Sequence, residues 1–279
     1  MLTCPICHST EMDGKIFDFS GYRIWTCQHC LVRFCQPLVD NRTVYTSEFI
    51  ARKEEYLEPE VPAIPPQLHR YVTGLSKKRI LDIGCGAGWF LDSLKESNDV
   101  LGLEVSAAYQ PILEQKGIPC RIGDLEQELA QLPDTSYDLI TMWDVFEHLY
   151  DPMMMLRLIK RKLTENGLLI NWTNNYDDII SRFAELTYRL SFGRMQTFMA
   201  QSFNRLNGHN YNFIPSTLRY IYDQVGLEIL HTLITDTPSD RLTQKMLFKM
   251  VLETFYALNR FTGKGKIICH VVKRSCAQG

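Results

Sequence analysis

Short apolar runs alternate with segments of helical periodicity through most of the chain. Five runs rich in β-branched and aromatic residues predict buried strands, at residues 79–83, 100–104, 118–122, 137–143 and 168–172. The segments between them repeat apolar residues three or four positions apart, which predicts helices. Strands that alternate with helices are typical of an α/β domain with a mostly parallel sheet.

Two later segments, residues 177–206 and 239–262, also repeat apolar residues at helical spacing. The first follows the fifth strand, so we interpret it as an insertion. Its helices either cap the ligand site and exclude water or pack on the sheet. Its methionine and phenylalanine side chains are adaptable enough to receive an apolar substrate. For the second segment, ordinary packing is favoured over a membrane surface or a dimer contact.

The first 36 residues carry two Cys-x2-Cys pairs, Cys4 with Cys7 and Cys27 with Cys30. Four thiolates at this spacing can close the tetrahedral shell of a structural Zn²⁺. The ribbon between them is too short to bury enough apolar surface alone, so the metal must supply its folding energy. Four unrelated buried cysteines, or a redox pair, explain the doubled arrangement less well.

Residues 37–66 predict a connector between the ribbon and the α/β domain. A short helix fits residues 48–57, and prolines break it at positions 59, 62, 65 and 66. We therefore expect a zinc ribbon at residues 1–36 and an α/β domain at residues 67–279, which contains the cap insertion.

Composition limits the classes of protein that fit. Hydrophobic residues make up 45% and charged residues 22% of the 279 residues, as in an ordinary globular protein. The formal net charge of −2 provides no basic field for nucleic acid. Nine cysteines, an odd number, and an N-terminus without a signal-peptide core argue against a secreted disulfide framework. We expect a soluble protein in the reducing cytoplasm.

A glycine turn follows the first predicted strand. Gly84, Gly86 and Gly88 alternate after Asp82, at a point where glycine lets the backbone approach a ligand closely. The next strand ends at Glu104, whose carboxylate can accept hydrogen bonds from a ribose diol. Dinucleotide-binding folds use a similar turn, so an NAD-dependent oxidoreductase is an alternative. The alternative for Glu104 is a solvated strand end.

The alternating glycines preceded by an acid resemble the S-adenosylmethionine (SAM) signature of class I methyltransferases. Residues 79–173, most strongly 132–170, and residues 209–226 are similar to the methyltransferase-23 group, which includes ubiquinone-biosynthesis O-methyltransferases and sugar methyltransferases. The resemblance implies a Rossmann-like seven-stranded sheet whose last strand, at residues 267–273, is reversed. The helical cap and the small N-terminal zinc ribbon are additions to that fold.

The arrangement of the whole chain also resembles a bacterial subgroup of these proteins. That subgroup has two Cys pairs and then an aromatic connector motif, which Tyr45 and Phe49 match. His8 and Leu31 depart from the pattern, because glycine commonly follows each Cys pair. The departure affects the geometry of the metal knuckles and leaves the four ligands in place.

The resemblance also implies residue roles in donor binding. Asp124 bonds the adenine amino group and Leu125 lines the ring pocket, whereas the alternative for Asp124 is a turn former after glycine. The implied SAM-binding residues are Asp82, Gly84, Cys85, Gly86, Gly88, Glu104, Val105, Asp124, Leu125 and Trp143.

Candidate catalytic residues follow the fourth strand, because ligands of open α/β sheets lie beyond the carboxyl ends of the strands. His148 is the first candidate for the base that takes a proton from the acceptor, since histidine ordinarily titrates near pH ~6.5. Glu147 orients that histidine or binds a metal with the substrate. His209 and Tyr211 are rival bases. The structural alternatives are a Glu-His pair that caps the next helix and a loop that packs beneath the cap.

These patterns favour methyl transfer from SAM to an oxygen or carbon of a small molecule, such as a sugar, a quinone-like compound or a secondary metabolite. The second hypothesis is an rRNA methyltransferase whose zinc ribbon binds RNA. The near-zero net charge opposes it, as does the lack of an Asn/Asp-Pro-Pro-Tyr motif after the fourth strand. The third is a SAM-binding scaffold without turnover. We expect SAM and a structural Zn²⁺ as cofactors, no nucleic acid, no favoured membrane contact, and a monomer or homodimer.

Overall fold

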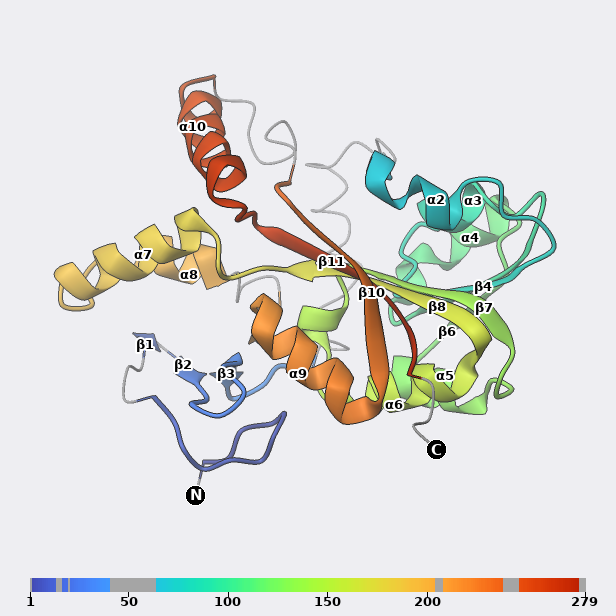
Figure 1. Ribbon diagram of the computed structural model, residues 1–279, viewed down its shortest axis with the longest axis horizontal. Helices are drawn as coiled ribbons and strands as arrows, with labels where there is room; N and C mark the ends of the chain where they lie inside the picture. The colour runs from blue at the N-terminus through green and yellow to red at the C-terminus, as the bar shows by residue number, and fades with distance from the viewer. Residues whose placement is uncertain are drawn as a thin grey trace.

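The computed structural model describes residues 2–13, 17–19, 21–40, 64–203, 208–237 and 246–275 (Figure 1). The connector motif of Tyr45 and Phe49 and the predicted helix at residues 48–57 lie outside these ranges.

Seven strands form one sheet in the order β10-β11-β8-β7-β4-β5-β6. Strands β4 to β8 pair in parallel, and β11 runs antiparallel to both β8 and β10. The predicted α/β class and the reversed last strand are therefore confirmed. The strands are β4 (Arg79–Ile83), β5 (Asp99–Glu104), β6 (Cys120–Ile122), β7 (Tyr137–Trp143), β8 (Leu163–Asn174), β10 (Leu227–Thr235) and β11 (Ile267–Arg274).

Helices cover both faces of this sheet (Figure 1). One face carries η2 (Pro66–Leu68), α2 (His69–Val72), α3 (Trp89–Asp92), η3 (Ala107–Tyr109) and α4 (Gln110–Gln115). The other carries α5 (Leu125–Gln131), α6 (Pro152–Lys162) and α9 (Pro215–Val225). The glycine turn leads into α3, which is a single helical turn.

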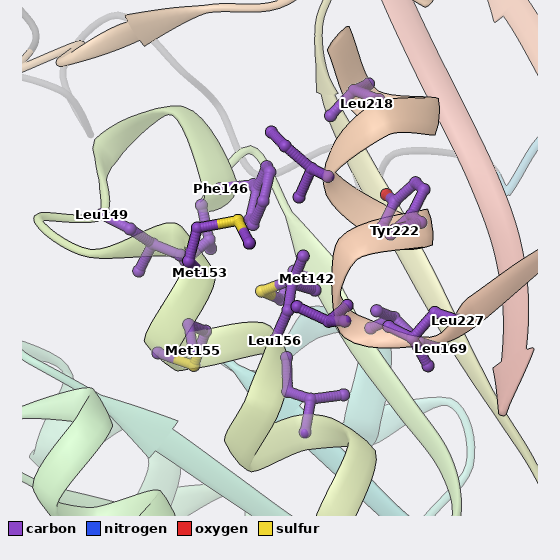
Figure 2. Packing of buried hydrophobic residues seen from close by; sticks show 14 of the residues in the cluster. Met142, Phe146, Leu149, Met153, Met155, Leu156, Leu169, Leu218, Tyr222 and Leu227 are labelled. Carbon is purple, nitrogen blue, oxygen red and sulfur yellow. The ribbon is translucent and has the colours of Figure 1, made fainter. Parts of the chain in front are cut away.

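Helix α6 shows how the local sequence sets this layer. It begins with Pro152 after Asp151, whose Oδ1 accepts a hydrogen bond from the Met154 amide at 2.9 Å. Figure 2 shows the buried side chains between α6, α9 and the sheet, with Leu156 close to Met142 of β7. The layer fixes where β7 ends and therefore where the predicted catalytic residues begin.

A second sheet, of four strands, joins the N-terminal ribbon to the α/β domain. The ribbon supplies β1 (Phe17–Phe19), β2 (Tyr22–Thr26) and β3 (Arg33–Gln36). The fourth strand is β9 (Tyr211–Asn212), which pairs with β3 and belongs to the methyltransferase-like segment at residues 209–226. Thr217 of α9 also donates a buried hydrogen bond to the Cys30 carbonyl at 2.9 Å. The ribbon is thus built onto the domain that it precedes.

The insertion after β8 is a helical hairpin of α7 (Ile179–Leu190) and α8 (Gln196–Phe203). The helices are as predicted, but their packing partner is not the sheet. Ala184, Met199 and Phe203 pack against Phe17 and Phe19 of the ribbon. The hairpin lies beside β1 to β3 in Figure 1. Several of its predicted core residues are exposed, among them Phe183, Leu186 and Leu190.

Helix α10 (Met246–Thr262) covers the described part of the segment predicted at residues 239–262. Its Leu252 and Tyr256 pack against Ile180 of α7. Within the part of the chain that the structure describes, no helix is both long and apolar enough to span a lipid bilayer.

Candidate active site

The turn between β4 and α3 has glycine at three alternate positions. Gly84, Gly86 and Gly88 all have positive φ, at 70°, 53° and 74°. A Cβ on Gly84 would lie 2.5 Å from Val145, and a Cβ on Gly88 would lie 2.7 Å from Leu113. A Cβ on Gly86 would meet no atom within 4 Å. The outer glycines are therefore required by packing, whereas Gly86 faces open space that a ligand can occupy.

Glu104 ties the glycine turn to the end of β5. Its Oε2 accepts a hydrogen bond from the Gly86 amide at 2.8 Å, and its Oε1 accepts one from the Ser106 amide at 2.9 Å. The carboxylate is 5% exposed and lies at the carboxyl edge of the parallel strands. It is therefore held beside the open position at Gly86, where a ribose would approach.

Asp82 is buried in β4, one strand away from Glu104. Its Oδ1 accepts a hydrogen bond from Thr141 Oγ1 at 2.6 Å. Burial, and to a smaller extent the negative charge of Glu104, raise the pKa of Asp82 to about 7, although the Thr141 hydrogen bond opposes the rise. In the absence of a positively charged ligand, the folded protein therefore keeps a proton on Asp82 well above the ordinary pKa of 3.8.

This burial predicts a pH dependence of stability. Between pH 3.8 and about 7, the unfolded chain releases the Asp82 proton and the folded chain keeps it, so the free energy of unfolding falls as pH rises. Asp82→Asn cannot titrate, so its advantage over the wild type should grow by about 1 kcal/mol per pH unit in this window. Urea unfolding of both proteins at pH 5, 6 and 7 measures it. A constant difference between them would contradict the assignment.

The other predicted donor residues surround this turn. Cys85 is buried, with its Sγ 3.8 Å from that of Cys120, and Val105 is half-buried after β5. Asp124 caps α5, because its Oδ1 accepts a hydrogen bond from the Gln127 amide at 2.9 Å. Leu125 is the half-buried first residue of that helix. Asp124 therefore acts as the N-cap of α5, and its contact with adenine stays a prediction.

Trp143 ends β7 beside the helix that follows the glycine turn. Its ring lies 5.5 Å from that of Trp89, 5.3 Å from that of Phe90 and 5.9 Å from that of Trp172, between centroids. Its indole Nε1 is buried and has no hydrogen-bond partner. Trp143 therefore links the donor turn to the end of β8 and holds one unused donor there.

The chain then turns sharply into the predicted catalytic residues. Asp144 is exposed and has a φ of 54°, a left-handed conformation that non-glycine residues adopt rarely. Glu147 lies three residues on in η4 (Phe146–His148) and is 1% exposed. Its Oε2 accepts a hydrogen bond from Thr173 Oγ1 at 2.7 Å. Burial, and then the charge of Asp144, raise the pKa of Glu147 to about 8, so this carboxyl is largely neutral at pH 7.

His148 and His209 meet edge to face, with ring centroids 4.6 Å apart. Asn174 Nδ2 lies 3.1 Å from His209 Nδ1. One ligand atom from each of Glu147, His148 and His209 lies within 4.8 Å of the others. The cluster can therefore move a proton or hold a divalent cation.

Tyr211 is not placed as a catalytic base must be. It is fully buried in β9, and its hydroxyl donates a hydrogen bond to the Tyr150 carbonyl at 3.0 Å. Burial raises its pKa far above the ordinary value of 10. Its backbone pairs with Phe34 of the ribbon. The geometry thus supports a structural role for Tyr211 instead of the role of rival base that the sequence suggested.

Asn210 is a residue that the sequence reasoning missed. Its backbone amide donates to the Glu147 carbonyl at 2.9 Å, and its Nδ2 reaches the carbonyls of His148 at 3.1 Å and Leu149 at 3.3 Å. The same side chain exchanges two hydrogen bonds with the Val39 backbone, at 2.7 and 2.9 Å. The signal available in the sequence was its position directly between the candidate bases His209 and Tyr211.

The four predicted zinc ligands come together in the ribbon. Cys4 Sγ lies 3.6 Å from Cys30 Sγ, and Cys7 Sγ lies 3.5 Å from Cys27 Sγ. A tetrahedral site with Zn–S bonds of about 2.3 Å has sulfur atoms about 3.8 Å apart, so the spacing fits zinc. All four sulfurs lie within 4.8 Å of one another. His8 and Leu31, which replace the usual glycines, both adopt positive φ, at 59° and 62°.

Comparison with known proteins places this geometry in context. A family model described as a methyltransferase domain matches residues 54–232. Among curated proteins, the ubiquinone biosynthesis O-methyltransferase of Acinetobacter baylyi is 26% identical over 107 residues, which is 36% of this chain and 45% of that protein. The chain thus spans about half the length of this curated relative.

Solved structures resemble the chain at the level of the fold. A SAM-dependent methyltransferase from Archaeoglobus fulgidus aligns with a TM-score of 0.52 and 19% identity, over 81% of this chain and 99% of that one. Phosphoethanolamine N-methyltransferase 2 from Haemonchus contortus, solved with SAM, aligns with a TM-score of 0.56 and 14% identity, over 88% and 62%.

Proposed function

Because the chain belongs to the family of methyltransferase domains, we propose that it transfers a methyl group from SAM to an oxygen or carbon of a small molecule. The acceptor is a sugar, a quinone-like compound or a secondary metabolite. The observation that carries this proposal is the open position at Gly86 beside the held carboxylate of Glu104. The ubiquinone-pathway relatives supply the precedent for a small acceptor.

The residues of the donor turn suit SAM, which supplies an electrophilic methyl group on a sulfonium when bound. Glu104 accepts hydrogen bonds from the ribose, and the backbone at Gly86 allows close approach. Asp82 releases its proton when a positively charged ligand arrives, because an opposite charge lowers a carboxyl pKa. Asp124 and Leu125 line the adenine pocket. The other residues that line the donor site are Cys85, Val105 and Trp143.

At the acceptor side, we assign the base to His148. His209 contacts Asn174 through its Nδ1, and its ring orients the edge-to-face ring of His148. Glu147 is neutral at pH 7 and keeps its hydrogen bond to Thr173, which holds the turn that carries His148 in place. A divalent cation held by Glu147, His148 and His209 is the second candidate for the same cluster. Turnover that Mg²⁺ stimulates several-fold favours the cation, and insensitivity to Mg²⁺ favours the base.

The ribbon, assigned to residues 1–36, holds a structural Zn²⁺ through Cys4, Cys7, Cys27 and Cys30 in this proposal. The sulfur spacing supports it. An RNA-binding role finds less support, because Arg23 and Arg33, the ribbon's basic residues that the structure describes, pair with Asp18 and Glu185. A gel shift with steep salt dependence would reverse that preference. We propose that the protein acts in the cytoplasm.

Substitution of Glu104 tests the donor site. Glu104→Gln keeps the size of the side chain and removes its charge, so one of the two amide hydrogen bonds at Gly86 and Ser106 must weaken. We expect SAM to bind at least about tenfold more weakly than to the wild type in calorimetry. Glu114→Gln on the exposed surface of α4 is the matched control and should bind SAM normally. Normal binding by Glu104→Gln would count against this donor site.

A further inference from the structure

Two buried donors without partners lie opposite each other where the ribbon joins the α/β domain. Arg33 of β3 and Asn212 of β9 are directly paired in register, so their side chains leave the sheet on the same face. Asn212 is 1% exposed, and its Nδ2 has no hydrogen-bond partner. The Nη1 of Arg33 is likewise buried and unpaired. Each such donor costs about 1–3 kcal/mol when left unsatisfied, so two of them on one face of paired strands point to a polar partner.

The orientation of both groups is fixed by their other contacts. Asn212 Oδ1 accepts a hydrogen bond from Asn174, which leaves the NH₂ of Asn212 as the free end. Arg33 stacks over the Tyr176 ring, 4.4 Å from its centroid, and its Nη2 pairs with Glu185 at 2.8 Å. Nη1 is the buried nitrogen of Arg33 that has no partner, so it can bind a further group.

The local charge favours an anion. Glu185 is shared by Arg33 and Arg189, so two guanidinium groups face this one carboxylate. The same place lies next to the candidate acceptor site, because Asn174 contacts both Asn212 and His209. A group bound by Arg33 and Asn212 would thus be one side chain away from the histidine pair.

We propose that Arg33 Nη1 and Asn212 Nδ2 bind an oxyanion, a carboxylate or a phosphate, carried by the methyl acceptor. The ribbon then contributes substrate recognition as well as a metal site. This inference rests on the proposed function for its link to methyl transfer, but the anion site itself does not require SAM. Both donors are shielded from solvent, so the acceptor enters when the α7–α8 hairpin moves off the ribbon.

Titration of the zinc-loaded full chain with benzoate, and separately with inorganic phosphate, tests the site. Benzamide, a neutral analogue of benzoate of the same shape, is the ligand control. We expect at least one anion to bind, and benzoate to bind more tightly than benzamide if the group is a carboxylate. Asn212→Asp replaces the free donor with an acceptor at constant shape, and Arg33→Met removes the guanidinium. Each should weaken anion binding by at least about tenfold.

Arg23→Met is the matched control, because Arg23 lies on the same ribbon and pairs with Asp18 at the surface. It should bind the anions as the wild type does. Zinc content and SAM affinity are measured in every variant to establish that the fold is intact. The proposal is overturned if neither anion binds the wild type, or if both Asn212→Asp and Arg33→Met bind the anions normally. Failure of the wild type to bind SAM would instead refute the proposed function alone.

Discussion

Cys27→Ser is expected to lose the ribbon zinc and to lower turnover on the order of 100-fold, while SAM affinity changes little. Structural zinc sites supply about 10–16 kcal/mol of folding free energy in small zinc modules, more than most domains have in total. Loss of one thiolate therefore unfolds the ribbon. The pairing of β3 with β9 is lost with it, and β9 directly follows His209 and Asn210.

The donor turn should survive this change, because Glu104 and Ser106 hold it on the sheet. Metal analysis, calorimetry with SAM and a turnover assay together measure the expected split. Cys35→Ser is the matched control, since Cys35 is a buried ribbon cysteine outside the tetrad whose Sγ contacts the Pro37 carbonyl. It should keep both zinc and turnover. Normal turnover by zinc-free Cys27→Ser would show that the ribbon does not support the catalytic residues.

The parts of the fold that the sequence predicted are those set by local patterns. The strand at residues 137–143 matches β7 residue for residue, because a strand buried on both faces is largely apolar, as five of its seven residues are here. Strand β10 escaped prediction. It lies at the sheet edge with only Leu227 fully buried, so its polar and apolar residues mix. Strand β9 has two residues, and only its remote partner β3 makes it a strand.

The candidate site likewise has parts that the sequence predicts and parts that it does not. The glycine turn is readable from sequence because glycine marks its three positive-φ positions, and Glu104 because it ends the next predicted strand. The left-handed backbone of Asp144 is not readable, since no glycine marks it. The hairpin after β8 was predicted as helices, yet its apolar pattern says nothing about which surface buries it. The apolar face of the hairpin packs against the ribbon, and no local signal in the sequence encodes that choice of partner.

Asn210 is the residue whose loss should most clearly separate positioning from folding. Its amide pairs with the Val39 backbone as a second peptide group would, and the same Nδ2 also reaches the turn at His148 and Leu149. Asn210→Ala leaves these buried backbone groups without partners, at a cost of about 3 kcal/mol or more. Released from Asn210, His148 shifts against His209. We expect kcat to fall on the order of 100-fold with SAM affinity unchanged.

The matched control for this loss is Asn98, another asparagine that ties backbone segments together, at the opposite edge of the sheet. Its side chain bonds the Leu75 and Leu94 carbonyls and the Lys78 amide. Asn98→Ala should therefore lower the unfolding temperature, as Asn210→Ala does, yet leave kcat and its pH profile unchanged. If Asn98→Ala and Asn210→Ala lose stability and turnover in the same proportion, Asn210 only holds the fold together. A shifted pH profile in Asn210→Ala alone assigns it to positioning the histidine pair.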